Sequence, residues 1–147
     1  MDVFLANEQD LSVGEARLSA LARHALTSMN VDSTAELSIL MVAPAHIRRL
    51  NARFAGDDAA TDVLSFPMMD EEESPLLLGD IVLCPEVARA NASRLGHSLD
   101  KELEVLLVHG ALHLLGYDHQ GSEDRAEMES HLSEIIDSFR FPAVRES

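Results

Sequence analysis

The sequence has few cysteines, few cations and no long apolar segment, and each absence narrows the class of protein. The single cysteine, Cys84, cannot form a disulfide within the chain, which fits a reducing cytosol. Its position at the end of an expected strand favours a small core residue over a metal ligand. No stretch of about 18 apolar residues is present, so we expect no membrane span. The N-terminal residues lack a basic segment followed by an apolar one, so we expect no signal peptide and a cytoplasmic protein.

Positive charge is scarce, because 11 Lys and Arg residues face 26 Asp and Glu residues and the formal net charge is −15. This balance is unfavourable for binding a polyanion, since affinity for phosphate comes mainly from Lys and Arg. The arginines do gather in two places, with Arg48, Arg49 and Arg53 in one group and Arg89 and Arg94 in the other. The two groups either form a positive groove on an acidic body or are ordinary charges on helix surfaces, and the sequence leaves both interpretations open.

Strand-like and helix-like segments are interleaved irregularly along the chain, which predicts the α+β class. The length of 147 residues and the hydrophobic content of 46% fit a single globular domain over residues 1–147. We expect a mixed four-stranded sheet with about five helices around it. The expected strands are 2–5, 36–42, 62–67 and 76–84, and the expected helices are about 14–29, 45–54, 85–95, 99–115 and, after a cap at Ser122, 123–139.

The segment from Val105 to His119 contains the main chemical signal. Residues 105–115 are apolar or Gly except for His109 and His113. A helix that is apolar all round is buried, and a buried imidazole is costly without a partner. Residues four apart lie on one helical face, so both rings can reach one point. Gly116 lets the backbone leave the helix, so that His119 can return to that point.

Three convergent imidazoles with one open coordination position predict a catalytic site for one Zn²⁺ ion, held by His109, His113 and His119. The central helix that carries the first two ligands should be the most buried element of the fold. Asp118, beside the third ligand, could orient a water molecule or a ligand ring. We expect Glu102 to be a surface residue that stabilises the helix dipole, and the residue that acts as general base stays unknown.

The same histidine spacing occurs in the long zincin protease motif H-E-x-x-H-x-x-G-x-x-H. In that motif the Glu after the first His is the general base. This chain has Gly110 at that position, and Gly has no side chain that could accept a proton. A metallopeptidase is therefore the weaker interpretation.

Residues 109–119 closely resemble the signature of a bacterial family, the YbeY endoribonucleases, which reads H-G-x-L-H-L-x-G-Y-D-H. This chain reads H-G-A-L-H-L-L-G-Y-D-H, a full match, and residues 61–67 and 79–84 agree with the family as well. The resemblance implies a zinc-dependent endoribonuclease that cleaves single-stranded RNA. It further implies a role in ribosomal RNA maturation, including the 3′ end of the small-subunit 16S RNA, and in ribosome quality control. Ribosomal particles and proteins bound to them would then be its partners.

The chain departs from the family pattern before residues 61–67. Phe54-Ala55 stands where the family commonly has Tyr-Arg, and Ala60 stands where a Pro is common. The family Arg is linked to cleavage, so Arg49 and Arg53 are candidates to replace it at Ala55. The departure keeps a further interpretation open, in which the protein is a non-catalytic ribosome-assembly factor with a structural metal.

Other polar residues carry weaker expectations. Asp62 and Ser65 are candidates to line the cleft, although Asp62 could equally cap a turn. Three imidazoles outside the motif are expected at the surface rather than at a metal, and these are His24, His46 and His131.

Overall fold

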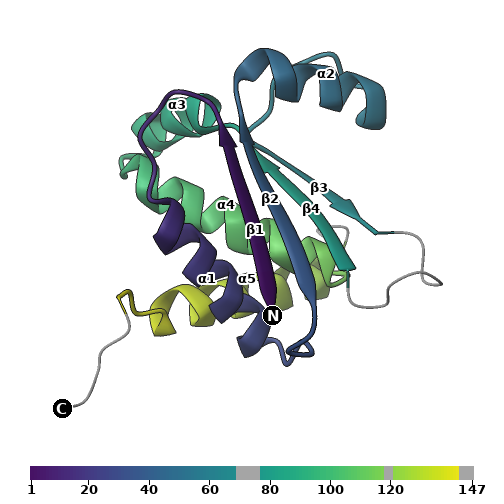
Figure 1. The fold of residues 1–147 in the computed structure, drawn as a ribbon, viewed down its shortest axis with the longest axis vertical. Helices are drawn as coiled ribbons and strands as arrows, with labels where there is room; N and C mark the ends of the chain where they lie inside the picture. Colours follow the sequence, from purple (N-terminus) through teal and green to yellow (C-terminus); the bar gives the residue numbers. More distant parts are fainter. Residues whose placement is uncertain (69–76, 118–120, 143–147) are drawn as a thin grey trace.

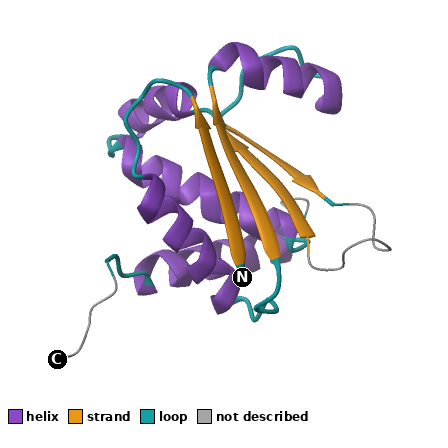
Figure 2. Cartoon of the chain, in the orientation of Figure 1, coloured by secondary structure: helices purple, strands orange, loops and turns teal. Residues whose placement is uncertain are grey.

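The structure, a computed structural model, describes residues 1–68, 77–117 and 121–142. Within these residues four strands and five helices follow one another in an irregular order, which confirms the predicted α+β class (Figures 1 and 2). The elements are β1 (Asp2–Glu8), α1 (Glu15–Ser28), β2 (Glu36–Val42), α2 (Pro44–Ala55), β3 (Val63–Pro67), β4 (Leu77–Leu83), α3 (Pro85–Leu95), α4 (Leu99–Leu114) and α5 (Ser122–Ser138).

The four strands form one mixed sheet in the order β1-β2-β4-β3. The middle strand β2 is parallel to both β1 and β4, whereas β3 is antiparallel to β4. Consequently β1 and β3 are the two edges of the sheet in the described part of the chain. Figure 1 shows α1, α4 and α5 on one face, and α2 beyond the upper end of the strands.

Local signals account for the bounds of several helices. Proline stands in the first turn of both α2 and α3, where its missing N–H is harmless and its fixed φ suits a helix. The N-cap of α4 is Ser98, whose hydroxyl accepts a hydrogen bond from the backbone N–H of Lys101 at 3.1 Å. These signals confirm the predicted bounds of α3 and the predicted start of α4. The predicted bounds of β2 are confirmed as well.

Helix α4 lies at the centre of the hydrophobic core, as its all-round apolar sequence predicts. Nine of its 16 residues are buried, and it packs against α1, α3, α5, β3 and β4. Leu103, Leu107 and Leu112 are among the largest side chains that are fully buried. The helix that carries the candidate ligands is therefore held from several sides. No described helix is both long and apolar enough to span a membrane.

The expectation for Glu102 is wrong. Its side chain is buried, with 6% of the residue exposed, and one carboxylate oxygen lies 2.7 Å from Nε2 of His97. Because α3 ends directly before α4 and packs along it, the first turn of α4 faces a neighbour instead of solvent. The Glu102 carboxylate therefore connects α4 to His97, in the turn between α3 and α4.

Several element bounds and three histidines also differ from expectation. The first strand continues to Glu8, because β1 pairs with β2 along its whole length, and the N-cap of α5 is Gly121 instead of Ser122. The three outlying histidines are half-buried rather than exposed, and they are His24, His46 and His131. Each of them contacts a neighbouring element or lines a pocket that the sequence did not indicate.

Candidate functional site

His109 and His113 lie one turn apart on α4, and their rings converge as their spacing predicts. Their Nε2 atoms are 2.9 Å apart, and the ring centroids are separated by 4.6 Å with a tilt of 60°. Both side chains are half-buried, so the pair lies at the boundary between core and solvent. His119 and Asp118, the other residues predicted at this site, lie outside the described residues.

The end of α4 turns the chain sharply, as Gly116 predicts. Gly116 has a φ of 100°, its N–H donates to the carbonyl of His113 at 3.0 Å, and the N–H of Tyr117 donates to that of Leu112 at 3.1 Å. These two bonds form a Schellman motif, in which the residue after the helix leaves the α-helical conformation. The turn therefore occurs three residues before His119.

Tyr117 attaches this turn to the last helix. Its hydroxyl lies 3.4 Å from Nε2 of His131, and the two rings meet edge to face with centroids 5.3 Å apart. His131 is on α5, so the start of the segment that leads to His119 is held by a second element. The sequence did not indicate this contact, because His131 lies 14 residues further along the chain.

A pocket of about 450 Å³ opens beside the imidazole pair. One wall is α4, which contributes His109 and His113, and the other is β3. The hydroxyl of Ser65 on β3 donates to the carbonyl oxygen of Gly110 at 3.4 Å. Among the described residues the lining contains no Lys, Arg, Asp or Glu, and it consists of Val63, Leu64, Ser65, Pro67, His109 and His113.

Of the two residues expected to line the cleft, Ser65 does so and Asp62 does not. The Asp62 carboxylate accepts a hydrogen bond from the side-chain amide of Asn91 at 3.1 Å, which ties the start of β3 to α3. Asn91 in turn accepts a bond from Arg94 at 3.2 Å. Asp62 and Arg94 therefore belong to a polar contact between elements instead of to the pocket beside the histidines.

At Gly110 the backbone of α4 comes into close contact with the sheet. A Cβ atom at this position would lie 3.1 Å from both Cγ2 of Ile81 and Oγ of Ser65. A Glu side chain would have to begin in that contact, where the protease motif has its general base. The structure thus gives a packing reason for the Gly that the sequence shows between the two ligands.

The first arginine group lies on α2 and does not line the pocket beside the imidazole pair. Arg48 forms two hydrogen bonds with Asp58, at 2.8 and 3.2 Å, and this guanidinium lowers the pKa of the Asp58 carboxyl below its usual value. The guanidinium of Arg53 lies 5.2 Å from the ring centroid of Phe54. Phe54 in turn contacts Phe66 of β3 edge to face at 5.4 Å, so Arg53 is connected to the strand that borders the pocket.

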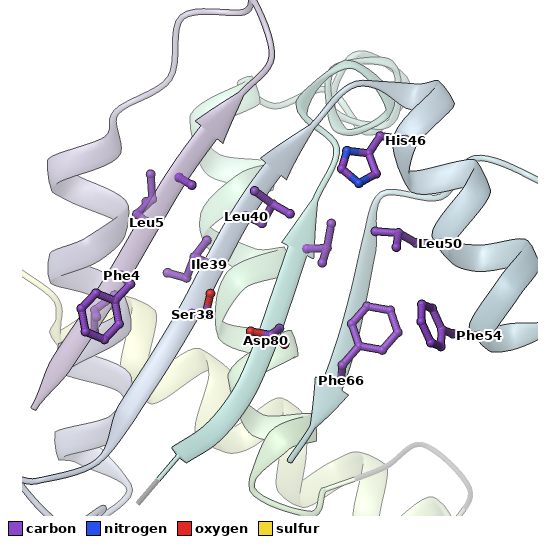
Figure 3. A pocket seen from close by; sticks show the side chains of 13 residues that line it. Phe4, Leu5, Ser38, Ile39, Leu40, His46, Leu50, Phe54, Phe66 and Asp80 are labelled. Carbon is purple, nitrogen blue, oxygen red and sulfur yellow. The ribbon is translucent and has the colours of Figure 1, made fainter. Parts of the chain in front are cut away.

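A larger pocket, of about 810 Å³, lies on the opposite face of the sheet, between the strands and α2 (Figure 3). Its lining is mostly apolar and includes Phe4, which is 58% exposed, and Phe54, which is 59% exposed. His46 and Asp80 also line it, but it lacks the paired imidazoles. The sequence did not indicate this pocket, whose lining comes from apolar residues of the strands and of α2.

The fold and the pocket define a class of protein, a small α+β protein with paired imidazoles on its central helix. A family model described as Endoribonuclease YbeY matches residues 4–140. "Endoribonuclease YbeY" of Frankia casuarinae is 45% identical over 150 residues, covering 95% of this chain and 75% of the relative. The protein of the same name from Acidothermus cellulolyticus is 44% identical over 151 residues, covering 95% of this chain and 92% of the relative.

The solution structure of TM1509 from Thermotoga maritima has a similar fold, with a TM-score of 0.62 and 26% identity. The likeness covers 97% of this chain and 99% of that one. This chain therefore belongs to the YbeY endoribonuclease family, as residues 109–119 indicated.

Proposed function

We propose that this protein is a metal-dependent endoribonuclease that cleaves single-stranded RNA in the pocket between β3 and α4. The observation that carries the proposal is the convergence of His109 and His113 at 2.9 Å beside a pocket of about 450 Å³, in a chain of the YbeY family. The resemblance of residues 109–119 extends the proposal to ribosomal RNA, including maturation of the small-subunit 3′ end, and to ribosome quality control. Residues 1–147 would act as one domain in the cytoplasm, with ribosomal particles as partners.

The paired imidazoles fit a zinc ion. Two nitrogens that each lie about 2.05 Å from a tetrahedral zinc are about 3.3 Å apart, so the present separation of 2.9 Å needs to grow by only a few tenths of an ångström. We assign His109, His113 and His119 as ligands of one Zn²⁺, with the fourth position open to water. A bound zinc lowers the pKa of its water toward about 7 and polarises a phosphoryl oxygen.

The chain's own residues shape the site around that ion. The buried position of α4 keeps the two rings side by side, and the Schellman turn at Gly116 ends the helix three residues before His119. Ser65 adds a hydroxyl to the opposite wall of the pocket. Gly110 supplies no general base, which favours RNA over peptide as the substrate.

The family's Arg is replaced here by Ala55, which leaves Arg49 and Arg53 as candidates to supply a cation near the RNA. Of the two candidates for that role, Arg53 is better supported than Arg49. Arg53 contacts Phe54, which packs against Phe66 of β3. Phe66 lines the pocket on the opposite face of the sheet, so the Arg53 guanidinium would reach the RNA across the edge of β3. Both arginines are exposed on α2, and no comparable chain of contacts connects Arg49 to β3 among the described residues.

Metal analysis together with an RNA cleavage assay tests this function. The wild type should contain one equivalent of zinc and cleave a single-stranded oligonucleotide. His113→Ala should fold but lose zinc and at least about a hundredfold in kcat/KM. His24→Ala is the matched control, because His24 is a half-buried imidazole on α1 that bonds to Ser138 at 2.8 Å and is not at the site.

The other outcomes of the same assay identify the alternatives. Cleavage that survives in a metal-free variant lacking all three histidines would contradict the proposal. Zinc binding without cleavage of any single-stranded RNA would favour the ribosome-assembly factor, which the absence of the family Arg at Ala55 leaves as the second candidate. Hydrolysis of peptides in place of RNA would support the metallopeptidase.

A further inference from the structure

Among the residues that the structure describes, β3 is an edge strand, and one set of its backbone groups points away from the sheet. In an antiparallel pair, alternate residues exchange hydrogen bonds with the neighbouring strand. The N–H of Cys84 donates to the carbonyl of Asp62 at 2.9 Å, and the N–H of Met68 donates to that of Leu78 at 3.1 Å. Since both pairs continue the register of β3 with β4, the even-numbered residues 62–68 bond to β4. The N–H groups of Val63 and Ser65 therefore point outward.

Pro67 supports this assignment of the edge. A proline cannot donate to a sheet ladder and is tolerated where the N–H would face away from the neighbouring strand. Pro67 is the next odd-numbered residue after Ser65, so it occupies an outward position without interrupting the ladder. The free edge of β3 thus offers two N–H groups, followed by a position without a donor.

This free edge borders the pocket that contains the imidazole pair. Val63, Ser65 and Pro67 all line that pocket together with His109 and His113. The side chain of Ser65 also faces α4, because its hydroxyl reaches the carbonyl of Gly110, the residue next to His109. Two backbone N–H groups and one hydroxyl therefore lie along the wall opposite the imidazoles (Figure 1 shows β3 at the rim of the sheet).

These donors suit a phosphodiester in an acidic protein. Uncharged N–H and O–H groups bind anionic oxygens in many proteins without a local cation, and the lining of this pocket includes no Arg or Lys among the described residues. Two N–H groups on alternate strand residues are about 6.6 Å apart. They can therefore reach two successive phosphates of an extended strand but not the oxygens of a single phosphate.

We propose that the free edge of β3 is the strand that binds the RNA backbone in this pocket. The N–H of Ser65 donates to the phosphate beside His109 and His113, and the Ser65 hydroxyl turns from the Gly110 carbonyl to donate to the same phosphate. The N–H of Val63 donates to a neighbouring phosphate. This inference rests on the proposed function and names Ser65 and Val63 as the residues that position its substrate. A peptide could also add to such an edge as a further strand, because the carbonyls of Val63 and Ser65 point outward beside their N–H groups. The protease base is missing at Gly110, however, and this favours RNA.

Proline substitution tests the backbone donor of Val63 directly. Val63→Pro removes the outward N–H and should leave the β3–β4 ladder intact, as Pro67 does. Val63→Ala is the matched variant, which shortens the same side chain but keeps the N–H. We expect KM for a single-stranded RNA oligonucleotide to be roughly tenfold higher for Val63→Pro than for Val63→Ala, with kcat equal within about twofold. Equal KM values for two folded, zinc-loaded variants would overturn the inference.

Substrates with a single methylphosphonate provide a second test that does not depend on a proline variant folding. This group removes one anionic oxygen at a chosen phosphate. A methylphosphonate at the cleaved phosphate or at an adjacent one should lower kcat/KM of the wild type roughly tenfold. Ser65→Ala should lower kcat/KM for the unmodified substrate by a similar factor. At the cleaved phosphate the two changes should be less than additive, because both remove the same contact. Full additivity would contradict the proposal.

The outcomes separate this inference from the proposed function. If the wild type does not cleave RNA, the proposed function fails, and the inference fails with it. If the wild type cleaves RNA and His113→Ala does not, but the edge variants and the methylphosphonates have no effect, only the inference fails. Cleavage of peptides that is lost in Val63→Pro would assign the edge to a peptide substrate and overturn the RNA proposal.

Discussion

Gly110 occupies a position of α4 that lies close against the sheet. A Cβ atom there would lie 3.1 Å from Ile81, which is fully buried, and 3.1 Å from the hydroxyl of Ser65. Replacing Gly by Ala inside a helix normally gains about 1 kcal/mol, whereas overpacking a core costs about 1–3 kcal/mol. Because Ile81 cannot move into solvent, we expect the cost of overpacking to exceed the gain.

Gly110→Ala should therefore lower the free energy of unfolding by about 1 kcal/mol, measured by urea denaturation. Ile81→Ala removes both Cγ2 and Cδ1 from the other side of the contact and should cost about 2–5 kcal/mol alone. In the double variant the loss of unfolding free energy should be smaller than the sum of the two single losses. The shorter side chain at position 81 makes room for the methyl group at position 110. A Gly110→Ala protein that is more stable than the wild type would show that the helix and the sheet can separate at this point.

Cys84 is fully buried where β4 meets α3, and burial raises the pKa of its thiol above the usual value. Because the thiolate is the reactive form, the native protein at pH 7.5 should resist a thiol reagent that labels the urea-unfolded chain within minutes. Mass spectrometry measures the labelled fraction. Rapid labelling of the native state would contradict the buried position of this residue.

The same pKa shift gives a pH dependence with a definite sign. The folded state holds the proton of Cys84 more tightly than the unfolded state. Its contribution to stability is therefore complete below the pKa of the unfolded thiol and is lost as the pH rises through the folded value. The difference in urea midpoint between wild type and Cys84→Ala should shrink between pH 7 and pH 10. A constant difference over this range would exclude a raised pKa.

At the scale of elements, α5 holds the turn that follows α4. Tyr117 and His131 meet edge to face at 5.3 Å, and the chain reaches His119 two residues after Tyr117. His131→Ala should therefore loosen the third ligand and lower zinc affinity on the order of tenfold. Competition with a coloured chelator measures this affinity, and urea denaturation of the metal-free protein measures the loss of stability.

His24→Ala is the control at this scale, because it also removes an imidazole that contacts α5. His24 bonds to Ser138 at 2.8 Å and lies against Phe139 at 5.6 Å, near the far end of the helix. The His24→Ala variant should lower the stability of the metal-free protein without changing zinc affinity. An equal loss of zinc affinity in both variants would mean that α5 acts only through general stability.

At the scale of the whole molecule, the net charge of −15 determines how RNA affinity depends on salt concentration. Each cation that contacts a phosphate of single-stranded RNA contributes about −0.7 to the slope of log affinity against log salt. If uncharged donors of β3 and Arg53 alone bind the strand, the slope should be about −1 or shallower. Fluorescence anisotropy with the His113→Ala protein measures binding without cleavage.

Arginine variants complete this measurement. Arg53→Ala should make the slope shallower by about 0.7. Arg49→Ala and Arg89→Ala should leave the slope unchanged, the second because Arg89 lies beside Glu8 and Glu86 on another surface. A wild-type slope steeper than about −3 would instead indicate the positive groove formed by both arginine groups, five residues in all.

The parts of the fold that sequence reasoning predicted correctly are those set by neighbouring residues. Pro85 and Gly96 delimit α3, Ser98 starts α4, and the separation of four residues places His109 and His113 on one face. These signals act within one or two helical turns, so they need no knowledge of the rest of the chain. His119 and Asp118 lie outside the described residues, and their roles therefore stay predictions.

Other features depend on segments that meet only after folding. Ser65 reaches Gly110 across 45 residues, and Glu102 is buried because α3 packs along α4. No local pattern indicates which strand forms the edge of the sheet or which of its N–H groups point outward. By itself, the sequence determined the identity and spacing of the candidate ligands and the class of the fold, because helical periodicity and capping are local. Only the tertiary structure decided what faces those ligands, because strand order and register depend on pairing between distant parts of the chain.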